Sequence, residues 1–107
     1  MDVYEALADP TRREIVTMLA SGERSAGDIA ERFPIAGPSV SRHLKVLRES
    51  GLIAYRREAT SRFYRLEPAP LEEVRQWMDA QLDVVKARFD RLAAHLDRMK
   101  AREEGDG

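Results

Sequence analysis

The chain has 107 residues, of which 43% are hydrophobic and 35% charged, and its formal net charge is −1 at neutral pH. This length suits one domain with its own core. The absence of cysteine excludes disulfides, thiolate metal ligands and cysteine redox switches. No apolar run approaches the roughly 18–20 residues that cross a bilayer. The acidic start is unlike a secretory signal, so we expect a cytoplasmic protein with no membrane partner.

Two short helices are predicted before residue 25. The first has an apolar face made by Val3, Ala6 and Leu7. Asp9 can cap the second helix, and Pro10 suits its first position because a missing N–H costs nothing there. Arg12 and Arg13 fall in the first turn, where the helix dipole disfavours cations. We expect them either to contact a phosphate or to form ordinary surface ion pairs.

The stretch from Ser25 to Gly51 predicts two helices joined by a tight turn. Ser25 can cap the first helix, at about 26–32. The second, at about 38–50, has one apolar stripe formed by Val40, Leu44 and Leu47. We expect Gly37 to be its N-cap, because no hydroxyl side chain stands in that place.

The face opposite this stripe is polar and basic. It carries Ser39, Ser41, Arg42, Lys45 and Arg48, with His43 towards one edge. Small hydroxyls near the N-terminus followed by basic side chains suit a helix that enters the major groove of DNA. The alternative is a solvated polar face.

After Gly51 the pattern changes to that of a β-hairpin at about 52–66. Two strand-like runs flank Glu58-Ala59-Thr60-Ser61, which we interpret as a four-residue loop, because it lacks glycine. Residues 42–65 carry a net charge of +5, whereas the segments before and after carry −3 each. This concentration favours a wing that contacts a nucleic-acid backbone or minor groove. The expected contacts are Arg56, Arg57, Thr60, Ser61 and Arg62, and the alternative is a solvated hairpin.

A long helix is predicted from about 71 to 102, followed by a frayed tail at 103–107. Its apolar residues recur alternately every three and four positions: Leu82, Val85, Phe89, Leu92, Leu96 and Met99. This spacing is a heptad seam. We expect the seam to pack against a second copy of the chain, together with Val3 and Leu7 of the first helix, in a two-fold interface. For 71–78 the alternative is packing on the protomer's own core.

Three segments resemble the ArsR/SmtB family of bacterial winged-helix repressors: 6–15 (ALADPTRREI), 38–52 (PSVSRHLKVLRESGL) and 62–66 (RFYRL). The resemblance implies a winged helix-turn-helix, mainly α with a small β-hairpin wing, dimerised through its N- and C-terminal helices as one domain over 1–102. It also implies a homodimer that binds a palindromic double-stranded DNA operator and represses transcription. The DNA contacts that the resemblance implies on the helix at about 38–50 are Pro38, Ser39, Ser41, Arg42, His43 and Lys45.

The family's metal sensors have ligands that this sequence lacks. Their thiolate site lies on the helix that matches 26–32, and the chain has no cysteine. Their C-terminal site has the pattern D-x-H-x10-H-x2-E; with its second histidine on His95, the other positions hold Leu82, Val84 and Arg98. None of these binds metal in that way. We therefore expect no metal and no cofactor, with His95 a surface or interface residue and any effector unknown or absent.

Two other classes of function make different demands on the sequence. An enzyme is disfavoured, because the two histidines lie far apart and there is neither a clustered carboxylate pair nor a phosphate loop. A winged-helix module that binds proteins without contacting an operator is the second alternative. That class predicts apolar side chains on the face that carries Ser39, Arg42 and Lys45, and the sequence places none there.

Overall fold

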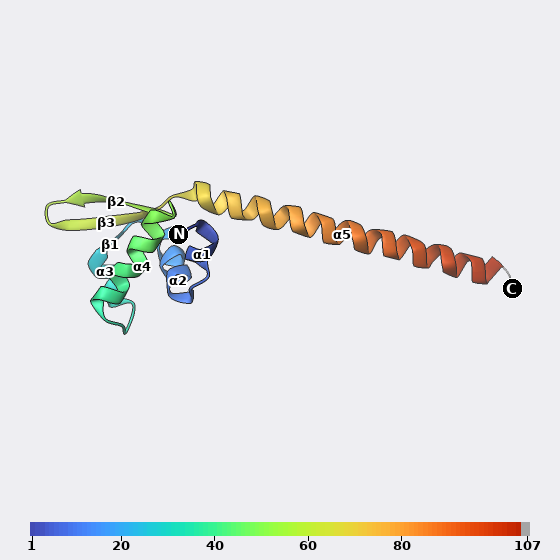
Figure 1. The fold of residues 1–107 in the computed structure, drawn as a ribbon, viewed down its shortest axis with the longest axis horizontal. Helices are drawn as coiled ribbons and strands as arrows, with labels where there is room; N and C mark the ends of the chain where they lie inside the picture. Colours follow the sequence, from blue (N-terminus) through green and yellow to red (C-terminus); the bar gives the residue numbers. More distant parts are fainter. Residues whose placement is uncertain (106–107) are drawn as a thin grey trace. The chain divides into compact units, whose positions relative to one another are not determined.

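The computed structural model describes residues 1–105 and divides into two compact units, Met1–Val74 and the chain from Arg75 onward. Each is described by itself. The elements in chain order are α1 (Val3–Leu7), α2 (Pro10–Ala20), β1 (Arg24–Ser25), α3 (Ala26–Glu31), α4 (Gly37–Glu49), β2 (Ile53–Glu58), β3 (Ser61–Leu66) and α5 (Pro68–Gly105). Figure 1 shows them along the chain. The predicted class, mainly α with a small β-hairpin after a helix-turn-helix, is confirmed.

The first three helices begin at the side-chain caps that the sequence predicts or allows. The Asp2 carboxylate accepts from the Glu5 amide at 2.8 Å. Asp9 accepts from the next two amides after Pro10, at 2.8 and 3.1 Å. The Ser25 hydroxyl accepts from the amide three residues on, at 3.1 Å. These bonds satisfy donors that have no partner inside a helix.

Helix α4 begins differently from the prediction. Its N-cap is Ala36 rather than Gly37, which is already helical. The extended Ala36 residue places its carbonyl oxygen to accept from the amides of Ser39 and Val40, at 3.0 and 3.3 Å. No side chain caps the helix. The prediction of a Gly37 cap is therefore wrong, and Pro38 follows one position inside the helix, where an N–H would lack a partner anyway.

The hairpin is part of a three-stranded antiparallel sheet with the order β1-β3-β2. The two-residue strand β1, which the sequence analysis did not anticipate, pairs with the middle of β3. Glu58 pairs with Ser61, so the turn has two residues, Ala59 and Thr60, and the predicted four-residue loop is wrong. Ala59 has a φ of +56°, which allows the tight turn without glycine at some cost in backbone strain.

The core of the first unit joins all its helices to the sheet. The predicted stripe of α4 is confirmed as buried, and it packs with Ile15, Ile29, Leu52, Ile53 and Tyr64. Val3 of α1 is 7% exposed, and Leu7 packs against the same core. The unit itself therefore buries Val3 and partly buries Leu7, the two residues of α1 that were expected at a dimer interface.

The second unit consists of the greater part of α5. The helix starts at Pro68, upstream of the predicted 71, and residues 103–105 of the predicted frayed tail are still helical. Residues 106–107 of that tail lie outside the described residues, and the single domain over 1–102 stays a prediction. The six seam side chains from Leu82 to Met99 are 43–66% exposed.

No helix within residues 1–105 is both long and apolar enough to cross a bilayer. Among the same residues, no three histidine, aspartate or glutamate side chains lie together as a metal site would require.

Candidate nucleic-acid interface

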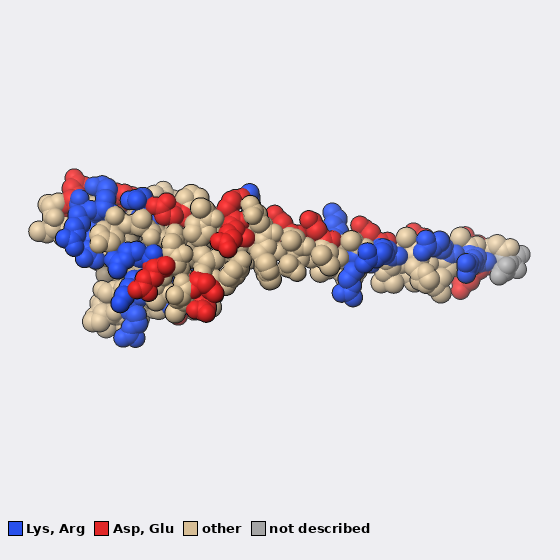
Figure 2. All heavy atoms as spheres, turned by 45° about the horizontal axis from the view of Figure 1, so that its top comes forward, with Lys and Arg blue, Asp and Glu red and all other residues tan. Residues whose placement is uncertain are grey.

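The exposed face of α4 carries most of the side chains predicted to contact DNA. Pro38, Ser41, Arg42 and Lys45 are exposed, whereas Ser39 and His43 are half-buried along one flank. Lys45 makes only a loose contact with Glu49, at 3.9 Å, and both side chains are more than half exposed. Figure 2 shows basic side chains gathered at the end of the first unit that carries the hairpin.

His43 is held by an arginine from another helix. Arg12 Nη1 lies 3.3 Å from His43 Nδ1. Arg12 also donates to the carbonyl oxygens of Glu5 and Ala6, at 2.9 and 2.7 Å. These contacts are neither a phosphate contact nor a surface ion pair, the two roles expected for Arg12. They tie the end of α1 to α4.

Arg13 makes a single contact with the end of α1. Its Nη1 donates to the Leu7 carbonyl oxygen at 2.8 Å, with both groups exposed. Both arginines of the first turn of α2 therefore donate to carbonyl oxygens at the end of α1, where a helix leaves its last carbonyls without intrahelical donors.

The hairpin has two chemically different faces, because side chains alternate along each strand. The inner face, which contributes Tyr64 to the core, carries Tyr55, Arg57, Arg62 and Tyr64, with Tyr55 opposite Tyr64 and Arg57 opposite Arg62. The outer face carries Arg56, Phe63 and Arg65. This division was readable from the period of two in the sequence.

The outer-face arginines are paired with carboxylates. Arg56 contacts Glu23 at 2.7 and 3.0 Å and Glu58 at 2.7 Å, and its guanidinium lies 4.8 Å from the centre of the Phe63 ring. The hydrogen bonds that Arg56 donates to Glu23 and, second, to Glu58 raise the pKa of Arg56. Arg65 pairs with Glu67 at 3.0 Å. This geometry favours a structural role for Arg56, which the sequence analysis had placed among the DNA contacts.

The inner-face arginines have aromatic neighbours instead. Arg62 and Arg48 lie 4.7 and 5.3 Å from the centre of the Tyr55 ring. A hydrogen bond with Tyr64 raises the pKa of Arg62. Within residues 1–105 no carboxylate forms an ion pair with Arg48, Arg57 or Arg62.

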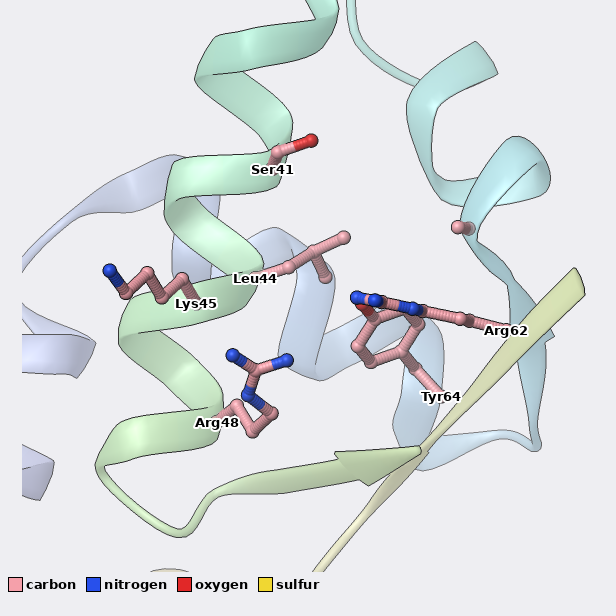
Figure 3. Close-up of a pocket in the computed structure, with 7 residues that line it drawn as sticks. Ser41, Leu44, Lys45, Arg48, Arg62 and Tyr64 are labelled. Carbon is pink, nitrogen blue, oxygen red and sulfur yellow. The ribbon is translucent and has the colours of Figure 1, made fainter. Parts of the chain in front are cut away.

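Two hollows adjoin this inner face. The first, of about 300 Å³, lies between α4 and β3 and is lined by Ala26, Ser41, Leu44, Lys45, Arg48, Arg62 and Tyr64. In Figure 3, Arg48 from α4 and Arg62 from β3 point towards one another across it. The second, of about 380 Å³, is lined by residues from the start of α3 and from the hairpin end, including Thr60 and Ser61. Arg48 lines the first hollow and lies one helical turn beyond Lys45 (Figure 3). It was not among the DNA contacts expected from the sequence.

Comparison with known proteins identifies the family. Residues 9–55 match the family model described as bacterial regulatory protein, arsR family. The chain is similar to the transcriptional repressor SdpR of Bacillus subtilis, with 40% identity over 77 residues that cover 72% of this chain and 86% of that protein. It is also similar to the HTH-type transcriptional regulator Rv2034 of Mycobacterium tuberculosis, with 43% identity over 76 residues, 71% of each chain.

The fold is similar to that of a solved structure. The crystal structure of the ArsR family transcriptional regulator RHA00566 superposes with a TM-score of 0.73 and 31% identity, over 78% of this chain and 86% of that one. The chain therefore belongs to the ArsR family of bacterial regulatory proteins, and it is a DNA-binding transcriptional regulator rather than an enzyme.

Proposed function

We propose that this chain is a homodimeric repressor that binds a palindromic operator, with α4 in the major groove and the hairpin on the adjacent backbone. The proposed contacts on α4 are Pro38, Ser39, Ser41, Arg42, His43 and Lys45. Those on the hairpin are Arg57, Thr60, Ser61 and Arg62. Arg56 is left out, because it is paired with two carboxylates.

One observation carries this proposal. The basic side chains on α4 and on the inner face of the hairpin have at most one loose carboxylate contact among residues 1–105, while those on the outer face are neutralised. Cations without a close carboxylate partner on adjoining elements suit a polyanion that runs past both. The face has no apolar patch of the kind that a protein partner would cover.

The proposed dimer uses the seam of α5. Six large apolar side chains at heptad spacing are about half exposed, and a second copy offers a matching stripe. Two copies of α4 have to reach successive major grooves, roughly 34 Å apart, so a helical interface can set the spacing. We also propose that DNA release does not depend on a metal site of the family type, because the sequence has no cysteine and only His95 on α5.

Selection of bound fragments from random duplex DNA, followed by binding titrations, tests the proposal. The expected result is a palindromic consensus, bound at least about a thousandfold more tightly than scrambled DNA at 0.15 M salt. A selection that returns no consensus, with equal affinity for every duplex, would contradict operator recognition.

A further inference from the structure

Arg48 and Arg62 form an arrangement that the fold itself does not require. They come from α4 and β3 and point towards one another across the first hollow (Figure 3), and both lie over the Tyr55 ring. The negative face of an aromatic ring attracts cations, so it offsets part of the repulsion between the two guanidiniums. No carboxylate lines the hollow.

The other polar groups around the hollow are also donors. The Lys45 ammonium and the Ser41 hydroxyl line it from α4, and Tyr64 closes it from β3. Guanidinium, ammonium and hydroxyl groups are the usual partners of phosphate oxygens. A hollow of about 300 Å³ has room for one phosphate group.

We infer that Arg48 and Arg62 clamp a single phosphate of the bound DNA strand, with Tyr55 as the positioning residue that holds both guanidiniums. The inference rests on the proposed DNA binding and adds Arg48 and Tyr55 to it. Because one phosphate then joins α4 to the hairpin, the clamp fixes the wing relative to the helix in the groove.

The surroundings of Arg62 support this reading. Tyr64 lines the hollow together with Arg62, and it is 4% exposed and belongs to the core, so one wall of the hollow is fixed by the fold. The Tyr55 ring lies beside that wall, with its centre 5.5 Å from that of Tyr64. A guanidinium fixed before binding loses less entropy when it meets its ligand.

The test compares Arg48→Met, Arg62→Met and the double variant on the selected operator at several salt concentrations. Each single change is expected to weaken binding by roughly tenfold. The loss of both side chains, which frees the one phosphate, is expected to reduce the slope of log affinity against log salt by about one. The double variant is expected to lose less than the product of the two single losses, because both side chains bind the same phosphate. Independent, multiplicative losses, or an unchanged slope in the double variant, would overturn the clamp.

Arg65→Met is the matched control. It removes the same charge from the same strand, but on the outer face, where Glu67 pairs with the guanidinium. Its salt slope is expected to stay that of the wild type, and a loss as large as that of Arg62→Met would overturn a specific clamp. If the wild type itself does not bind DNA, the proposed function is wrong. If the wild type binds and the Arg48 and Arg62 variants keep its affinity and salt slope, only the clamp is wrong.

Tyr55 is tested through replacement of its ring. Tyr55→Phe keeps the ring and is expected to keep the salt slope, whereas Tyr55→Leu removes the ring and is expected to lower the slope by up to about one. Folding is checked by a thermal melt of each variant. Equal slopes for the Leu and Phe variants would contradict the positioning role.

The phosphate could also come from the free ion. Arginine Nε signals of Arg48 and Arg62, followed by NMR, are expected to shift with operator DNA and to stay fixed with inorganic phosphate up to 20 mM at constant ionic strength. Saturation by inorganic phosphate with release of DNA would show an effector site and overturn the clamp.

Discussion

Replacing Arg12 by methionine tests how the first unit is held together. The change keeps an unbranched side chain but removes the guanidinium that bonds to Glu5 O and Ala6 O, at 2.9 and 2.7 Å. Hydrogen bonds from a charged group contribute about 1.5–3 kcal/mol each to stability. The Glu5 bond is exposed, which reduces its share. The expected loss in the free energy of unfolding is therefore about 2–4 kcal/mol.

Arg13→Met is the matched comparison for Arg12→Met. It lies in the same helical turn and makes one exposed bond, to Leu7 O at 2.8 Å. Its removal should cost about 1 kcal/mol or less. In a domain of this size 1 kcal/mol changes the melting temperature by about 4–8 °C. Circular dichroism melts at one fixed protein concentration should thus show a far larger drop for Arg12→Met. Equal drops for the two variants would refute the assigned role.

The remaining predictions concern recognition, assembly and pH. Arg42→Ala should lose about 1–3 kcal/mol of affinity for the operator and much less for scrambled DNA; an equal loss on both would identify a phosphate contact. Leu92→Asp should give monomers by sedimentation, because the seam would bury an unpaired charge, and a persistent dimer would contradict the seam. For Asp9, burial raises the pKa, but amide hydrogen bonds from Arg12 and Thr11 and the nearby cations outweigh it, so the pKa lies below its ordinary value. The ionised carboxylate therefore stabilises the fold above about pH 4, and this contribution is lost as pH falls through the folded pKa. Urea midpoints should show Asp9→Asn gaining on the wild type between pH 7 and pH 3, and a constant difference would contradict this.

Local signals gave most of the first unit. The caps at Asp9 and Ser25 and the buried stripe Val40, Leu44 and Leu47 depend on residues within one or two turns, and the structure confirms them. The cap at Ala36 could not be predicted from side chains, because only its carbonyl takes part. The turn at Ala59 was missed for a similar reason, since alanine adopts a positive φ only when strand pairing imposes it.

The site depends more on contacts that are distant in the sequence. Periodicity found the exposed face of α4, but the partner of Arg56 is Glu23, 33 residues away. The contact of Arg12 with His43 spans 31 residues. No local pattern encodes such pairs, so the sequence analysis placed Arg56 among the expected DNA contacts without its carboxylate partners. The strand β1 escaped for the same reason, because it has only two residues and pairs with β3.

The central claim is that two copies present α4 at a separation of one helical turn of DNA. The most direct measurement combines sedimentation of the operator complex with affinity on operators whose half-sites are moved apart. The account predicts two chains per duplex and an affinity that falls to the level of scrambled DNA when 5 bp are inserted, because the second half-site then faces the opposite side. One chain per duplex, or an affinity that ignores the insertion, would contradict it.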